Sequence, residues 1–131
     1  MRKVFEFGLL ILLLNLFTAK ASAQPQVIIS EVGNWKCEKD LKSRWEFKSD
    51  GRLVKTYQGT DARLSYSYMI SETKPACPNV QLAVEPNVKY LKTINDKYGN
   101  VDCFYIYALN EQRFTVMDAL TGHIFPFIRV E

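Results

Sequence analysis

Residues capable of nucleophilic or acid–base catalysis are scarce in this chain. The only histidine, His123, follows a turn glycine, Gly122, and precedes an apolar segment. Nucleophilic catalysis requires a base beside the nucleophile, and no second imidazole is present to serve as one. We therefore expect His123 to be structural or exposed.

Carboxylate pairs do not indicate an active site either. Glu31 with Glu38, and Asp96 with Asp102, lie near expected turns and are typical of solvated charges. A glycosidase would need two carboxyl groups facing each other across a cleft, an arrangement that sequence alone does not exclude. The chain has neither a glycine-rich phosphate loop nor the cysteine and histidine spacing of a zinc site. We expect a protein that is not an enzyme and holds no cofactor or metal.

Aromatic side chains are the residues best suited to binding a ligand. The candidates, at positions expected in strands, are Trp45, Phe47, Tyr66, Tyr68 and Tyr105. One interpretation is a ligand cavity with apolar walls and a few hydroxyl partners. The other is that these rings only fill the interior, because a barrel of about eight strands encloses little more than its own side chains.

Residues 1–23 are typical of a cleavable export signal. A charged start leads into the apolar run Leu9–Leu14, and Ala21-Ser22-Ala23 gives a small-x-small cleavage site. We expect cleavage after Ala23, a domain over residues 24–131, and a secreted or periplasmic location. A retained membrane anchor is the alternative, but about ten strongly apolar residues fall short of the roughly 20 that a membrane span needs.

The expected mature domain is close to neutral in charge. The sequence of 131 residues has a net charge of +3, and residues 24–131 contain 14 basic and 13 acidic side chains. Nucleic-acid-binding domains carry a strongly basic surface. We therefore expect no nucleic-acid partner, and no transmembrane segment in the mature chain.

Short alternating segments separated by turn residues predict an all-β fold. Residues 44–48 alternate polar and apolar types, and Asp50-Gly51 then predicts a tight hairpin turn with positive φ at both positions. Turn signals recur at the spacing of sandwiches and barrels. Strands joined in this way favour an up-and-down antiparallel barrel of about eight or nine strands, which removes both sheet edges. The expected strands are 34–38, 44–48, 52–57, 63–70, 80–84, 89–94, 101–108, 113–118 and 123–130.

Three motifs in a fixed order resemble a known family. The segment Ile29–Trp35 contains G-x-W, the hairpin over 45–53 reads W-x-F-x-x-D-G-x-L, and Arg129 lies on the last expected strand. Together they resemble the small secreted lipocalin-like domains of bacteria, which are calycin-type β-barrels. The resemblance implies that Gly33, Trp35 and Arg129 form a structural motif, in which the arginine packs across the indole at the closed end of the barrel.

The same resemblance implies a function in binding. We expect a secreted, non-catalytic protein that binds a small apolar or amphipathic molecule at the open end of the barrel. The alternative is an envelope or extracellular module with a filled barrel, which contacts a protein or glycan through loops such as 71–79 and 95–100. The oligomeric state does not follow from the sequence.

Three cysteines allow three pairings and leave one thiol over. Cys37 shares its strand face with Trp35, so it should point into the barrel as a small hydrophobic side chain. Cys77 lies in a loop with two prolines, and Cys103 begins a strand after another loop. We expect a Cys77–Cys103 disulfide in an oxidising compartment; pairing of Cys37 with one of them is the alternative.

Overall fold

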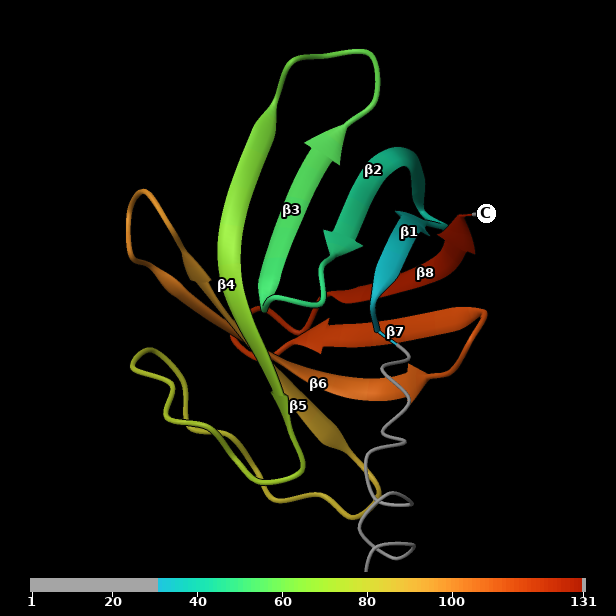
Figure 1. Ribbon diagram of the computed structural model, residues 1–131. Helices are drawn as coiled ribbons and strands as arrows, with labels where there is room; N and C mark the ends of the chain where they lie inside the picture. The colour runs from blue at the N-terminus through green and yellow to red at the C-terminus, as the bar shows by residue number, and fades with distance from the viewer. Residues whose placement is uncertain (1–30, 131) are drawn as a thin grey trace, which may run out of the picture.

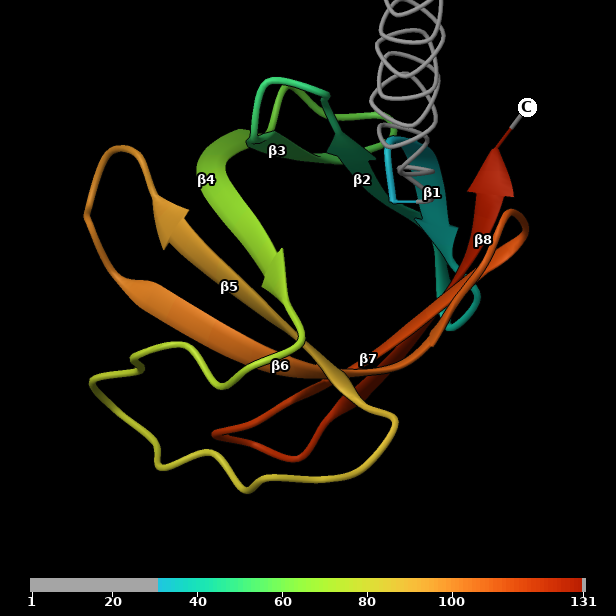
Figure 2. The same ribbon diagram turned by 60° about the horizontal axis from the view of Figure 1, so that its bottom comes forward.

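The computed structural model describes residues 31–130, in which eight β-strands and no helix occur. Each strand pairs antiparallel with the next along the chain, and the last pairs with the first, so the sheet closes into a barrel (Figures 1 and 2). In chain order the strands are β1 (Gly33–Cys37), β2 (Asp40–Phe47), β3 (Arg52–Tyr57), β4 (Arg63–Ser71), β5 (Lys89–Asn95), β6 (Val101–Leu109), β7 (Arg113–Asp118) and β8 (Ile124–Val130).

The expected all-β, up-and-down antiparallel barrel is therefore confirmed. The expected export signal over residues 1–23 and the first residues of the expected domain, 24–30, lie outside the described residues. Nowhere in residues 31–130 does a helix have the length and apolar character needed to cross a membrane.

The two ends of the barrel differ, and we name each by a residue. Loops 48–51 and 110–112 lie at the Trp35 end, where β1 begins and β8 finishes. Loops 58–62, 96–100 and 119–123, and the short β1–β2 connection, lie at the Lys55 end. This separation follows from the up-and-down order, because alternate connections of such a barrel emerge at the same end.

The β2–β3 hairpin closes with a different turn from the one expected at Asp50-Gly51. Gly51 has a positive φ of 86°, but the only non-glycine residue with positive φ in the described chain is Asn87. The amide of Gly51 donates to the carbonyl of Lys48 at 3.2 Å, and the amide of Lys48 donates to the carbonyl of Arg52 at 2.8 Å. A turn followed by a single glycine with positive φ is typical of hairpin loops that are longer than two residues.

Residues 80–84, expected as a ninth strand, do not form one. They belong to the long connection between β4 and β5, which runs outside the ring of strands beside β6 (Figure 2). Two tyrosine hydroxyls replace a strand partner: the amide of Ala83 donates to Tyr105 Oη, and Tyr90 Oη donates to the carbonyl of Ala83, each at 2.9 Å. Leu82, which is part of this connection, packs against Tyr90 and Tyr105 on the outside of the barrel and is only 5% exposed.

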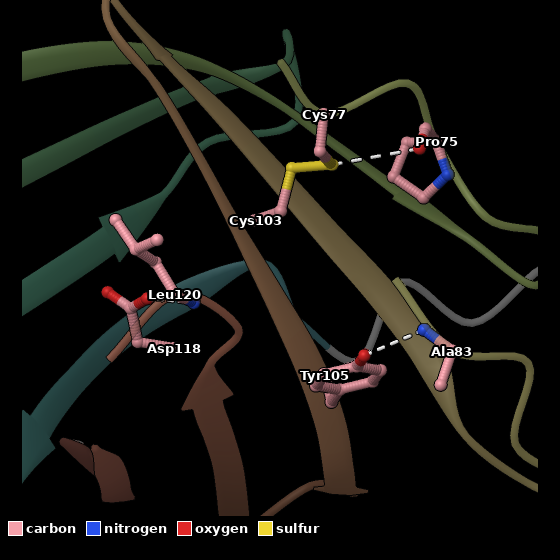
Figure 3. Close-up of a disulfide and its surroundings, with 7 residues drawn as sticks. All are labelled: Pro75, Cys77, Ala83, Cys103, Tyr105, Asp118 and Leu120. Atoms are coloured by element: carbon pink, nitrogen blue, oxygen red, sulfur yellow. Dashed lines mark hydrogen bonds between the residues drawn. A yellow bond between two sulfur atoms is a disulfide. The ribbon is translucent and has the colours of Figure 1, made fainter. Parts of the chain in front are cut away.

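The expected disulfide joins this connection to the barrel wall. Cys77 and Cys103 are bonded, with their Cα atoms 6.4 Å apart, and Cys37 is a free, buried thiol in the interior (Figure 3). Figure 3 also shows Tyr105 reaching Ala83 from the same strand, β6. The long connection is thus held by one covalent bond and by side-chain hydrogen bonds.

The Trp35 end is built around the contact that the family resemblance implied. Trp35 is fully buried, and the guanidinium carbon of Arg129 lies 4.3 Å from the centroid of its ring. Arg129 also donates to the carbonyls of Val32, at 2.8 Å, and Glu111. Gly33 has φ of 133°, and a Cβ there would collide with the Arg129 guanidinium. Glycine is therefore required at Gly33 both by its backbone and by the arginine.

Replacing Trp35 with alanine should destabilise the barrel by about 3–5 kcal/mol, because it removes a large buried ring and leaves a cavity. The measurement is the free energy of unfolding in urea. Leu41→Ala is the matched control; the Leu41 side chain is 56% exposed, so the loss should stay within about 0.5 kcal/mol. If the two variants unfold at the same urea concentration, Trp35 does not hold the barrel together.

Removing the disulfide by Cys77→Ser with Cys103→Ser should lower the free energy of unfolding by roughly 3–4 kcal/mol. The bond spans a sequence separation of 26, and a loop of that size restricts the unfolded chain by about this amount. Non-reducing peptide mapping should recover a linked Cys77–Cys103 peptide, with Cys37 alkylated only after unfolding. A linked peptide that contains Cys37 would contradict this assignment.

Candidate functional site

Aromatic rings fill the middle of the barrel. The centroids of Trp45 and Phe127 are 4.6 Å apart, and Phe104 lies 5.8 Å from Trp45 at a near-perpendicular angle. Toward the Trp35 end, Phe114 lies 5.6 Å from Trp35 and 5.4 Å from Phe47. Rings at these separations pack against one another in favourable tilted and edge-to-face arrangements.

Of the five aromatic residues proposed from the sequence as a ligand site, Trp45, Phe47, Tyr66 and Tyr68 belong to the interior cluster, and Tyr105 does not. Trp45 and Tyr66 lie in the middle layer of the interior. Phe47 and Tyr68 contact each other toward the Trp35 end, at 4.8 Å between centroids, and Tyr68 Oη donates to the carbonyl of Lys48 at 3.1 Å. Burial raises the pKa of Tyr68 to about 12, and the charges of Glu31 and Asp50 act in the same direction.

Tyr105 lies on the opposite side of the sheet. It packs outside the barrel with Tyr90 and Leu82, beneath the long β4–β5 connection. Its neighbours Phe104 and Ile106 face the interior instead, as alternation along a strand requires. Tyr105 therefore cannot line an interior cavity, and its expected grouping with Tyr66 and Tyr68 is wrong.

The main feature that the sequence analysis missed is a lysine inside the barrel. Lys55 Nζ lies 4.2 Å from the ring centroid of Trp45, 4.4 Å from that of Tyr66 and 5.8 Å from that of Phe104. A cation over an aromatic face is attracted to it, by about 0.5–2 kcal/mol. Among residues 31–130, no carboxylate oxygen lies within the 4.0 Å of an ion pair with Lys55.

The hairpin register and the burial of its neighbours place Lys55 on the interior face of β3. Lys55 is two residues from Leu53, which is fully buried in the core, and the hairpin register sets it opposite Trp45. Val54, on the other face of β3, is also buried. Because β3 is buried on both sides, its pattern of polar and apolar residues does not show which face is interior.

Further polar groups surround Lys55 at its end of the barrel. Asp102 shares the inward side of β6 with Phe104, and Asp118 shares the inward side of β7 with Val116. Burial lowers the pKa of Lys55 to about 8, although the charges of Asp102 and Asp118 act in the opposite direction. The site therefore holds an amine that is partly neutral near physiological pH.

Thr93 adds a hydroxyl without a partner. It is paired with Asp102 across the β5–β6 ladder and is fully buried, yet its Oγ1 has no hydrogen-bond partner among the described residues. Leaving a buried hydroxyl unsatisfied costs about 1–3 kcal/mol. Such a group is suited to bind a polar atom that enters the barrel from this end.

A recess of about 350 Å³ opens at the Lys55 end. The Phe125 ring in its wall lies 6.4 Å from the buried ring of Trp45, over which Lys55 lies. His123, the only histidine, is exposed at its rim, 6.5 Å from Phe125 between centroids. The recess is lined by Cys37, Lys39, Asp40, Ser43, His123, Ile124 and Phe125.

The carboxylates considered for catalysis do not form a facing pair. Glu38 forms an ion pair with Arg113 at 2.6 Å, and Asp96 forms one with Arg52 at 2.7 Å, on the outside of the barrel. Within residues 31–130, no three His, Cys, Asp or Glu side chains are grouped so that they could hold a metal ion.

Comparisons of the chain with protein-family models, with curated proteins and with solved structures found no match.

Raising the pH should stabilise the protein through Lys55. Below about pH 8 both the folded and the unfolded states hold the proton, and folding buries a charge. Between pH 8 and 10.5 the folded state releases the proton before the unfolded state does. The free-energy cost of burying the charged amine on folding therefore falls, and the free energy of unfolding rises by an amount on the order of 2–3 kcal/mol. The measurement is the difference in unfolding free energy between wild type and Lys55→Met from pH 6.5 to 10.5.

That difference should shift in favour of the wild type as the pH rises through this window. Lys42→Met, on the exposed side of β2, is the control, and its difference from the wild type should stay constant. Comparing each variant with the wild type cancels the titration of groups far from Lys55, which both proteins share. A flat difference for Lys55→Met would show that the ammonium is solvated.

Proposed function

We propose that this protein is a non-catalytic binding protein for a small amphipathic molecule, which enters at the Lys55 end of the barrel. The observation that carries this proposal is the Lys55 ammonium, which stands over three aromatic rings without an ion-pair partner. A charge kept inside a barrel costs stability unless it is paired. Charges retained at such a cost are common in functional sites.

The surroundings of Lys55 favour a ligand with an aromatic or apolar body and a polar head. Phe125 and Ile124 give the recess an apolar wall, and Trp45 lies 6.4 Å behind Phe125 between ring centroids. The Lys55 ammonium and the Thr93 hydroxyl would then bind the head. A largely apolar wall with a few polar groups is typical of small-molecule sites.

Export from the cytoplasm is part of the same proposal. It is supported by the charged start, apolar run and small-x-small site of residues 1–23, and by the Cys77–Cys103 bond. The secreted lipocalin-like identity suggested by the sequence motifs is supported by the eight-strand barrel and by the contact between Trp35 and Arg129.

Two probes with the same aromatic frame test the proposal: the anion 1-anilinonaphthalene-8-sulfonate and the neutral N-phenyl-1-naphthylamine. Both should bind saturably, and Lys55→Met should weaken the binding of the anion about tenfold, a loss of roughly 1.4 kcal/mol in binding free energy. The affinity of the neutral probe should change less than about twofold, because this probe makes no charged contact. Lys42→Met is the matched control and should leave both affinities unchanged.

The two tryptophans report where the probes bind. Trp45 contacts Lys55, whereas Trp35, its partner across the β1–β2 ladder, contacts Arg129, so quenching should fall more in Trp45→Phe than in Trp35→Phe. Near-UV circular dichroism confirms that each variant is folded, since loosely packed states also bind these dyes. If neither probe binds the folded wild type, the barrel is filled and the alternative of a protein- or glycan-binding module gains support.

A further inference from the structure

We propose that Lys55 captures small aromatic aldehydes covalently, as imines formed inside the barrel. This inference rests on the proposed function, since the aldehyde would enter the same site. It adds the chemical class of the ligand and a reversible covalent bond between ligand and protein.

The position of Lys55 suits a nucleophile that must be reached from solvent. Lys55 is only half-buried, and the Trp45 ring beneath its ammonium lies 6.4 Å from Phe125 in the wall of the recess. No ion pair with a described residue holds the amine in place. A planar aromatic aldehyde lying along Trp45 and Phe125 would bring its carbonyl carbon toward Nζ.

The surroundings of Lys55 also favour the reactive form of the amine. Burial lowers its pKa to about 8, whereas an unperturbed lysine has a pKa of about 10.4. A larger share of Lys55 is therefore neutral at pH 7, and only a neutral amine has the lone pair needed to attack a carbonyl. Desolvation of lysine in an apolar pocket is a recognised route to imine chemistry.

The reaction balances without any further reactant. The lone pair of the neutral Nζ attacks the carbonyl carbon, the C=O π electrons move to oxygen, and a proton passes from nitrogen to oxygen to give a carbinolamine. The nitrogen lone pair then forms the C=N bond as the C–O bond breaks, and the hydroxyl leaves as water with the second amine proton, so that one aldehyde and one amine give one imine and one water. The polar groups that face this region include the unpartnered Thr93 hydroxyl, the Tyr66 hydroxyl and the carboxylates of Asp102 and Asp118.

Reductive trapping of the full chain tests the inference. The protein is incubated at pH 7 with 2-naphthaldehyde and cyanoborohydride, and each lysine-containing peptide is quantified by mass spectrometry. We expect Lys55 to gain one naphthylmethyl group at least tenfold faster than any other lysine. In urea this advantage should disappear, because it depends on the folded barrel.

Matched variants separate chemistry from folding. Lys55→Arg keeps the positive charge but forms no imine. The total labelling of this variant should therefore fall to the amount contributed by the remaining lysines. Lys42→Arg should leave the labelling of Lys55 unchanged.

A non-reactive analogue distinguishes this inference from the proposed function. 2-Naphthalenemethanol has the same aromatic frame without a carbonyl, and it should bind and slow the labelling of Lys55. If the alcohol binds but Lys55 reacts no faster than the other lysines, covalent capture is wrong and the binding function stands. If Lys55 is labelled selectively although neither naphthalene dye binds, capture stands and the amphipathic ligand is wrong. If neither the dyes nor the alcohol bind and labelling is unselective, both are overturned.

Discussion

The pairing of β1 with β8 is the constraint on which the rest of the structure depends. It sets Trp35 opposite Arg129 in the ladder and joins the two edge strands of an eight-strand meander. A slip of one residue would move every side chain of β1 to the other face of the sheet. The arginine over the indole, together with the space that Gly33 leaves for it, therefore selects a single register, and with it a single set of inward-facing residues.

Much of the fold follows from the sequence because alternation and turn chemistry are local properties. The strands around Trp45 and Tyr66 and the presence of a hairpin turn at Gly51 were predictable in this way, although the turn type was not. The disulfide was inferred separately, from the positions of Cys77 and Cys103 in loops beside strands. Residues 80–84 also alternate, but pairing is not local. The proline-containing connection runs outside the barrel, and the hydroxyls of Tyr90 and Tyr105 supply the hydrogen bonds that a strand partner would have given.

The candidate site was less predictable, for two physical reasons. Aromatic residues occur on both faces of β6, since the long connection covers its outer face; the sequence therefore could not show that Phe104 faces inward and Tyr105 outward. Lysine is also the residue type least expected inside a small barrel. Lys55 becomes recognisable only when the rings of Trp45, Tyr66 and Phe104 are seen to converge on its ammonium.

The long β4–β5 connection has a consequence for how the surface of this protein can diversify. Its attachment depends on a few points: the bond from Cys77, the buried side chain of Leu82 and the main chain of Ala83. Hydrogen bonds to main-chain atoms place little demand on the side chain at the same position, and Val84 is 76% exposed. Many other positions of the connection can therefore exchange residues without disturbing the barrel. An exposed loop that is fixed at a few points on a rigid sheet is a suitable scaffold for grafting new sequences or selecting them from libraries.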